Sequence, residues 1–241
     1  MHDNNKIRLN QYLSHAGISS RRKADKLIQS GVIEVNGIPI NKLGTTINTN
    51  DIVTFNGSKI KTKNKIYILL NKPKGFITST QDEFNRKTVM NLISNYSEYK
   101  IFPVGRLDYS TTGVLLLTND GYLSEKLTHP KYKIKKIYHV LLNKKIKNED
   151  LEKIRKGKIY LREGKVKVIF VNKIDTKNQV KIGLYMGWNR IIKRIFKKLN
   201  YQVIRLDRVY FGGFSKKYIK KIGSWCFFNE KEVKNIIQKE L

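Results

Sequence analysis

The chain has 241 residues and a mass of 28.2 kDa, and 49 Lys and Arg against 19 Asp and Glu give a formal net charge of +30. This length suits one large domain or two smaller ones, and a hydrophobic content of 40% excludes a disordered basic tail. No apolar run, Val114–Leu117 included, approaches the roughly 18 residues of a membrane span. Met1–Asn5 lack the apolar stretch of a signal peptide, so we expect a cytoplasmic protein without a membrane partner.

The single cysteine, Cys226, excludes an intramolecular disulfide, and with only four scattered histidines it excludes a zinc site of the usual spacing. The surplus of positive charge attracts phosphate groups. A compositional drift toward Lys, Asn and Ile is the alternative explanation of that surplus. Drift spreads charge evenly, whereas residues 186–221 hold eleven basic residues against Asp207 alone. We therefore expect a nucleic-acid-binding face in that segment.

The first part of the chain predicts two short helices. Apolar residues recur at helical spacing from Leu9 to Ala16, and Gly17 stands where a C-terminal cap belongs. Ser19 or Ser20 is positioned to cap a second helix, which Gly31 ends.

One hairpin and a further turn follow these helices. Asn36-Gly37 separates the β-type runs Val32–Val35 and Ile38–Ile40 and favours a hairpin with a type I′ turn. Asn56-Gly57 follows the run Asp51–Phe55 and marks another turn. The polar, lysine-rich stretch 59–65 is the expected linker, which divides the chain into domains at residues 1–62 and 63–241.

From residue 66 onward, β-rich runs alternate with helical stretches. Strands are expected at Ile66–Leu70, Val114–Thr118, Tyr138–Leu142, Val166–Val171, Val180–Tyr185 and Gln202–Leu206. Helices are expected at Thr88–Ile93, Tyr122–Leu127, Arg190–Leu199 and Glu230–Gln238. Because few long helices separate the strands, the pattern predicts an α+β domain with a largely antiparallel sheet.

The segment 104–121 is the strongest candidate for chemistry. Asp108 lies on a loop between two apolar runs, with Arg106 two residues before it and Gly105 and Gly113 bracketing the turn. Loop groups held by rigid strands are where catalytic residues concentrate. The alternative is an aspartate that satisfies turn amides, and the pattern alone favours that simpler role.

Gly105–Asp108 resembles the Gly-Arg-Leu-Asp motif of RsuA/RluB-type rRNA pseudouridine synthases, a family with an N-terminal S4 RNA-binding domain. The remaining motifs match in chain order at residues 19–25, 70–75, 129–140, 189–196 and 206–208. Together they extend over roughly residues 6–235. The resemblance implies a small S4 domain at 1–62, of helices and a β-hairpin. It implies a catalytic domain at 63–241 with a largely antiparallel mixed sheet flanked by helices.

The same resemblance assigns roles at the site. Asp108 corresponds to the catalytic nucleophile and Lys193 to the cation that keeps it ionised. Arg106 is a second candidate for that cation and corresponds to a residue that orients the flipped-out nucleotide. Tyr138 corresponds to the tyrosine that stacks on the target uracil, and Leu206 to an apolar residue packed against the base. A half-buried strand aromatic and an ordinary core leucine are the alternatives for the last two.

The remaining implied contacts are cationic. RNA-binding roles fall on Arg8, Arg21, Arg22 and Lys23 in the first domain and on Lys72, Arg190 and Arg194 in the second. A solvated basic helix face is the alternative in the first domain, but a helix start disfavours consecutive cations. Trp188 stands where the family usually has Arg, so the expected phosphate contact is absent there unless the indole stacks on a base instead.

The resemblance implies isomerisation of a specific uridine to pseudouridine in ribosomal RNA, with the large subunit preferred and no metal or cofactor. Ribosomal RNA or a pre-ribosomal particle is the expected partner, and self-repulsion of so cationic a chain favours a monomer. Two alternatives stay open. One is a non-catalytic assembly factor that binds rRNA, and the other is a glycosidase, for which Asp120 is the only acidic neighbour of Asp108 in this segment.

Overall fold

The structure is a computed structural model that describes residues 6–48, 50–60, 64–93, 100–174 and 178–240. Two compact units divide the chain. One holds Met1–Lys65, Glu98–Lys100 and Asn119–Gly121, and the other holds the remaining residues. The domain boundary expected between residues 62 and 63 falls at 61–63, outside the described residues.

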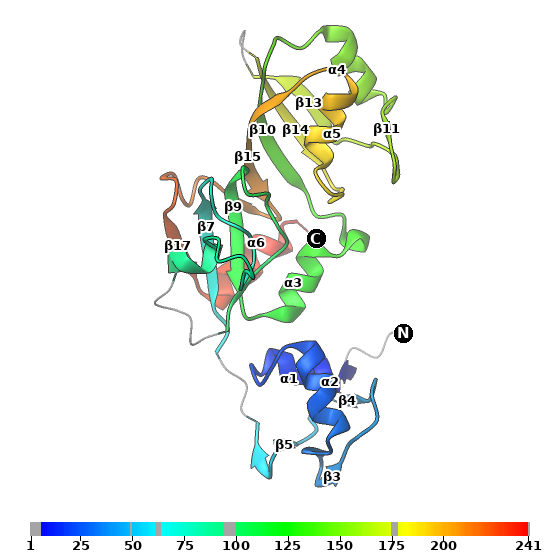
Figure 1. Cartoon of the computed structure of the whole chain (residues 1–241), viewed down its shortest axis with the longest axis vertical. Coiled ribbons are helices and arrows are strands. Elements are labelled where there is room, and N and C mark those ends of the chain that lie inside the picture. The colour runs from blue at the N-terminus through cyan, green and yellow to red at the C-terminus, as the bar shows by residue number, and fades with distance from the viewer. Residues whose placement is uncertain (1–5, 49, 61–63, 94–99, 175–177, 241) are drawn as a thin grey trace. The chain divides into compact units, whose positions relative to one another are not determined.

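The first unit packs two helices against short strands (Figure 1). Its elements are β1 (Lys6–Arg8), α1 (Leu9–His15), α2 (Arg21–Gln29), β2 (Ile33–Val35), β3 (Ile38–Pro39), β4 (Thr46–Asn48), β5 (Val53–Phe55) and β6 (Ser58–Lys59). Ser20 caps α2 by accepting a hydrogen bond from the Lys23 backbone. Asn36 and Gly37 both have positive φ, at 52° and 79°, so the predicted type I′ turn between β2 and β3 is confirmed.

A mixed sheet of nine strands forms the second unit, in the order β13-β14-β10-β15-β9-β7-β17, with β16 paired to β15 and β8 to β9. The strands are β7 (Tyr67–Lys72), β8 (Phe102–Pro103), β9 (Thr112–Thr118), β10 (Lys136–Leu142), β13 (Phe170–Lys173), β14 (Gln179–Leu184), β15 (Val203–Phe211), β16 (Phe214–Ser215) and β17 (Trp225–Phe228). Every neighbouring pair is antiparallel except β9 and β15. The predicted α+β class with a largely antiparallel sheet is confirmed.

Helices cover this sheet over two apolar cores. The helices are α3 (Gly121–Thr128), the 3-10 helix η2 (Pro130–Tyr132), α4 (Asn148–Arg155), α5 (Ile191–Lys198) and α6 (Glu230–Gln238), and a small hairpin pairs β11 (Tyr160–Leu161) with β12 (Gly164–Lys165). One core joins α4 and α5 to β10, β13, β14 and β15, and the other joins α3 and α6 to β7 and β9 (Figure 1). The longest helices in the described ranges have nine residues, too short to cross a bilayer.

Several predicted elements differ from the structure. The helix expected over Thr88–Ile93 is a 3-10 helix over residues 89–93. The strand expected over Val166–Val171 begins only at Phe170, because Val166 and Val168 pack into the core without pairing in the sheet. α4 was not expected, since it has only two apolar residues, Leu151 and Ile154, both of which face the core. β15 continues five residues beyond the predicted Leu206.

The parallel pair of β9 and β15 depends on a glycine. Asp207 is in register with Thr112, and Arg208 with Gly113. A Cβ at Gly113 would lie 2.2 Å from the Arg208 carbonyl oxygen, and its φ of +113° is one that other residues rarely adopt. The absence of a side chain therefore allows the two strands to approach at this point.

Replacing Gly113 with Ala should destabilise the protein by about 3 kcal/mol or more, because the new methyl group clashes with backbone that cannot move independently. Urea unfolding followed by circular dichroism measures this change. Gly187→Ala is the matched control, since a Cβ there meets nothing within 4 Å, and should change stability by less than about 0.5 kcal/mol. Equal stability of the two variants would contradict the close approach.

Candidate active site

Residues 104–111 form the loop that precedes β9, which we call the Asp108 loop. The ammonium group of Lys72 holds the backbone of this loop. Lys72 is fully buried at the end of β7. Its Nζ donates hydrogen bonds to the backbone oxygens of Pro73, Asp108 and Thr111 at 3.0, 3.2 and 3.0 Å. Burial lowers the pKa of Lys72 to about 8, and the negative charge of Asp108 acts in the opposite direction.

The segment that follows Lys72 provides two further anchors. The Thr78 hydroxyl donates to the Leu107 oxygen at 2.8 Å and accepts from the Leu107 amide at 3.2 Å. The Gly75 amide donates to the Tyr109 oxygen at 3.0 Å. Backbone groups on both sides of Asp108 are therefore fixed by residues 72–78, which leaves its side chain as the projecting group.

Two cations from the start of α5 lie beside the Asp108 carboxylate. Lys193 Nζ is 3.4 Å from Asp108 Oδ2 and also donates to Ser110 Oγ at 2.9 Å. Arg190 Nε is 3.9 Å from the same oxygen. The side chain of Asp108 is 30% exposed, so the carboxylate is accessible while it remains paired.

An unusual backbone conformation places Arg190 beside the carboxylate. It precedes α5 with a φ of +48°, in the left-handed region that non-glycine residues seldom occupy. Its side chain is 64% exposed, against 29% for Lys193. Lys193 is thus the fixed partner of the carboxylate, and Arg190 is the exposed one.

The buried Arg208 links Tyr138 to the β9–β15 pair that follows the Asp108 loop. On β10, Tyr138 is in register with Arg208 of β15, next to an irregularity of the strand. Arg208 is buried, donates from Nε to the Val114 oxygen at 2.9 Å and lies over the Phe211 ring at 4.4 Å. Burial lowers the pKa of Arg208, and the Tyr138 phenol opposes that shift. Since Arg208 is also in register with Gly113, Tyr138 lies two strands from β9, about 10 Å across the sheet.

A second polar cluster stabilises the pairing of β9 with β15, which we call the β9–β15 junction. Asp207 is mostly buried and accepts hydrogen bonds from the Thr112 hydroxyl at 2.6 Å and from Lys216 Nζ at 2.8 Å. These contacts join β9, β15 and the segment after β16.

The structure brings Asp108, Lys193 and Arg190 together, and it connects Tyr138 to the same junction. Arg106 is exposed on the Asp108 loop, and within the described ranges its side chain has no hydrogen bond or ion pair. Leu206 is buried in the core that includes α5, which fits its alternative role as a core leucine.

Two of the predicted RNA-binding cations are held by contacts within the protein. Lys72 cannot reach a phosphate, because its ammonium is buried and bonded to three carbonyls. Arg194 is held by a bidentate ion pair with Glu163 of the β11–β12 hairpin, at 2.7 and 2.8 Å. Trp188, where the family usually has Arg, packs half-buried against the core.

In the first unit, the predicted RNA-binding cations lie at the starts of the two helices. Arg8 ends β1 and takes the N-cap position of α1. Arg21, Arg22 and Lys23 form the first turn of α2, and all three are exposed. The helix itself has no acidic residue in that turn to offset them.

Sequence reasoning missed the residues that position the site. Thr78, Thr112 and Arg208 carried no expected role, and Lys72 carried a different one. The available signal was a polar residue in a strand: Lys72 ends a fully buried strand, and Arg208 precedes the apolar end Val209–Phe211 of its strand.

Comparisons with known proteins agree on one family. The family model described as RNA pseudouridylate synthase matches residues 66–207, and the S4 domain model matches residues 7–53. The chain is 39% identical to the ribosomal large subunit pseudouridine synthase B of Bacillus subtilis, over 83% of this chain and 84% of that protein. It is 37% identical to an uncharacterised RNA pseudouridine synthase of Aquifex aeolicus, over 96% and 94%.

A crystal structure of a pseudouridylate synthase has the same fold, with a TM-score of 0.68 over 95% of this chain and 99% of that chain at 24% identity.

The buried ammonium of Lys72 predicts a specific dependence of stability on pH. In the unfolded chain this lysine keeps its proton up to about pH 10.5, whereas the folded protein releases it near pH 8. Between these values the unfolded state binds more protons, so raising the pH favours the folded state. As the pH rises from about 8 to about 10.5, the free energy of unfolding of the wild type should therefore increase relative to that of Lys72→Met, by up to about 3 kcal/mol.

Urea unfolding at a series of pH values measures this difference. Lys74→Met is the control, because Lys74 is exposed and its removal should give a difference that does not change over the same range. A stability difference between the wild type and Lys72→Met that does not change with pH would show that the ammonium is not buried as described.

Proposed function

The chain belongs to the RNA pseudouridylate synthase family, and from this premise we propose that it isomerises one specific uridine of large-subunit ribosomal RNA. Enzymes of this family are isomerases. Asp108 is the proposed nucleophile. The observation that carries this assignment is the Asp108 carboxylate itself, accessible yet 3.4 Å from Lys193 on a loop fixed by Lys72.

The reaction balances within the nucleotide. The N1–C1′ bond of uridine breaks, the freed uracil turns, and a bond between C5 and C1′ forms while the hydrogen of C5 is lost and N1 regains one. No redox change occurs, so the atom balance calls for no metal or cofactor. A carboxylate that attacks or supports an electron-poor carbon is what this sequence of steps needs.

The charges around Asp108 suit that role. A partly exposed ion pair contributes only about 1 kcal/mol to stability, so Lys193 and Arg190 have little structural reason to meet at this carboxylate. Two cations placed against one accessible carboxylate therefore point to a functional role for that group. Arg190, the more exposed cation, is in addition positioned to meet an RNA phosphate next to the target.

Tyr138 is the proposed stacking partner of the everted uracil. A base removed from its helix loses stacking energy, and an aromatic face restores part of it. The buried Arg208 beside the phenol supports this role, because a cation held within the sheet fixes the side chain that it contacts. Exposed Arg106 on the Asp108 loop is the proposed residue that orients the nucleotide.

The N-terminal unit is the proposed RNA-holding module. The S4 domain match and the exposed Arg21, Arg22 and Lys23 support this assignment, and we extend it to Arg8. A-form RNA is read by shape and backbone contacts, for which flexible cations suffice. The Bacillus subtilis relative is a ribosomal large subunit pseudouridine synthase, which supports large-subunit rRNA, free or in a pre-ribosomal particle, as the partner. A cytoplasmic monomer remains our proposal.

Replacing Asp108 with Ala should lower pseudouridine formation in a large-subunit rRNA transcript to below about a thousandth of the wild-type rate, because the nucleophile is lost. Affinity for the transcript should change by less than about threefold, because the phosphate contacts remain. Chemical labelling of pseudouridine and filter binding measure the two quantities. Asp82→Asn is the control, since Asp82 is also a loop carboxylate paired with a cation, Arg86 at 2.7 Å. It should retain wild-type activity.

The same assay separates the alternatives. Conversion that survives in Asp108→Ala contradicts the assignment of the nucleophile. A wild-type protein that binds the transcript but converts no uridine in any rRNA fragment is an assembly factor. Release of free uracil instead of pseudouridine identifies a glycosidase.

A further inference from the structure

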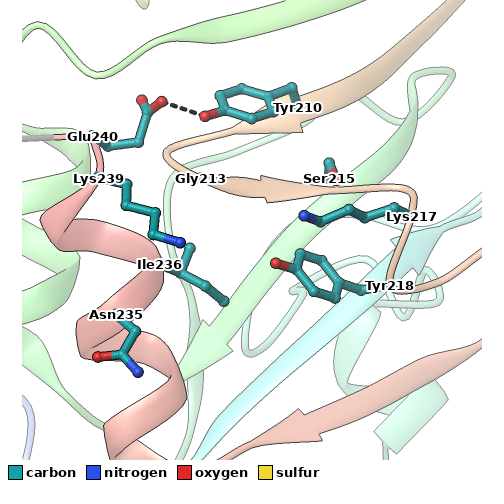
Figure 2. Close-up of a pocket in the computed structure, with 9 residues that line it drawn as sticks. All are labelled: Tyr210, Gly213, Ser215, Lys217, Tyr218, Asn235, Ile236, Lys239 and Glu240. Atoms are coloured by element: carbon teal, nitrogen blue, oxygen red, sulfur yellow. Dashed lines mark hydrogen bonds between the residues drawn. The ribbon is translucent and has the colours of Figure 1, made fainter.

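A cavity of about 260 Å³ lies between α6 and the β15–β16 hairpin with the turn that follows it, and we call it the α6 groove (Figure 2). The residues that line it include Tyr210, Ser215, Lys217, Tyr218, Asn235 and Lys239. Gly213 lets the helix approach the hairpin, because a Cβ there would lie 2.5 Å from Ile236 Cγ2. None of the residues assigned above to Asp108 or its cations lines this groove.

The polar groups of the α6 groove are mainly donors. Figure 2 shows the ammonium groups of Lys217 and Lys239 and the hydroxyl of Tyr218 turned toward the space between helix and hairpin. Lys217 Nζ lies over the Tyr218 ring, 4.8 Å from its centroid, which restrains the ammonium. In the described part of the chain neither lysine forms an ion pair. Two cations and a hydroxyl that converge in this way suit an anion.

One carboxylate also lines the groove, and its charge is already matched. Glu240 accepts a hydrogen bond from the Tyr210 hydroxyl and lies 3.5 Å from Lys135 Nζ. Burial, reinforced by Glu240, raises the pKa of Tyr210, so the phenol keeps its proton and remains a donor to the carboxylate. The end of the groove near Lys217 and Lys239 therefore stays positive.

The α6 groove shares its framework with the candidate active site. Tyr210 follows Arg208 by two residues on β15, about 7 Å along the strand. Lys216, next to Lys217, binds Asp207 at 2.6 Å. Beyond it, the backbone oxygens of residues 219–221 accept hydrogen bonds from buried Asn71, the residue before Lys72. The groove is thus fixed to the same strands that carry the Asp108 loop.

We propose that the α6 groove binds a phosphodiester of the RNA substrate, with Lys217, Lys239 and the Tyr218 hydroxyl as its donors. Its volume suits a phosphate with part of a ribose, and exposed Lys220 and Lys221 extend the positive surface beside it. Residues 216–221 are the far end of the basic stretch 186–221, and none of them contacts the Asp108 carboxylate. Naming RNA as the source of the phosphate rests on the proposed function.

The test compares two pairs of substitutions that remove the same charge from the full-length protein. Lys217→Gln with Lys239→Gln changes the groove, and Lys156→Gln with Lys158→Gln changes two exposed lysines after α4. Fluorescence anisotropy measures the affinity for a labelled single-stranded oligouridylate over a range of salt concentrations. Inorganic phosphate is added as a competitor at constant ionic strength. Tyr218→Phe removes only the hydroxyl and preserves the ring contact with Phe228.

The groove pair should weaken RNA binding by about tenfold and reduce the slope of log affinity against log salt by about 0.7, the value for one phosphate contact on a single strand. The control pair should weaken it by less than about twofold. Tyr218→Phe should weaken binding by roughly threefold. Inorganic phosphate should compete with the oligonucleotide on the wild type and less on the groove pair.

Equal weakening by both pairs would overturn the proposal, because only net charge would then matter. Competition by phosphate without a loss of RNA affinity in the groove pair would also overturn it, since the groove would then bind free phosphate alone. Unchanged RNA affinity in both Tyr218→Phe and the groove pair would also overturn the proposal. If these variants instead lost binding to a protein partner, the groove would be a protein-binding site. Failure of the proposed function appears separately, as absence of pseudouridine formation by the wild type while the groove pair still binds RNA more weakly than the control.

Discussion

The buried ammonium group of Lys72 sets the geometry of the Asp108 loop. A lysine loses hydration when it is buried, and three backbone oxygens replace the lost water. Two of these oxygens belong to Asp108 and Thr111, so the cost of burial is balanced only while the loop keeps its shape. Thr78 fixes Leu107 from the same side. The carboxylate of Asp108 then projects from backbone that is already held, which is the condition for a preorganised site.

The remaining partners arrive from distant segments. Gly113 admits β15 beside β9, and that parallel pair brings Arg208 and Tyr138 to the same junction. α5 contributes Lys193, with its apolar face buried under the sheet. The α6 groove uses the far end of β15, so one strand connects the proposed chemistry with the proposed phosphate contact.

Local signals predicted what depends on neighbouring residues. A type I′ turn requires positive φ at both central positions, which Asn36-Gly37 provides, and this dipeptide predicted the hairpin. The last helix begins at the predicted Glu230, where Asn229 and Glu232 form a capping box. Tertiary contacts were beyond such signals. Arg194 meets Glu163 from 31 residues away, and Lys72 is buried by a loop 36 residues later. The family motifs identified Asp108 and Lys193 as partners, but only the fold distinguishes a cation that contacts solvent from one that holds the loop.

We propose that the protein converts a uridine of ribosomal RNA in the cell and that this reaction depends on the carboxyl group at position 108. Mapping pseudouridines at nucleotide resolution in ribosomal RNA measures this directly, in cells that lack the gene and carry either the wild type or Asp108→Ala. We expect one pseudouridine of the large subunit to disappear on deletion, to return with the wild type and to stay absent with the variant. A complete set of pseudouridines in the deletion strain, or equal restoration by Asp108→Ala, would contradict it.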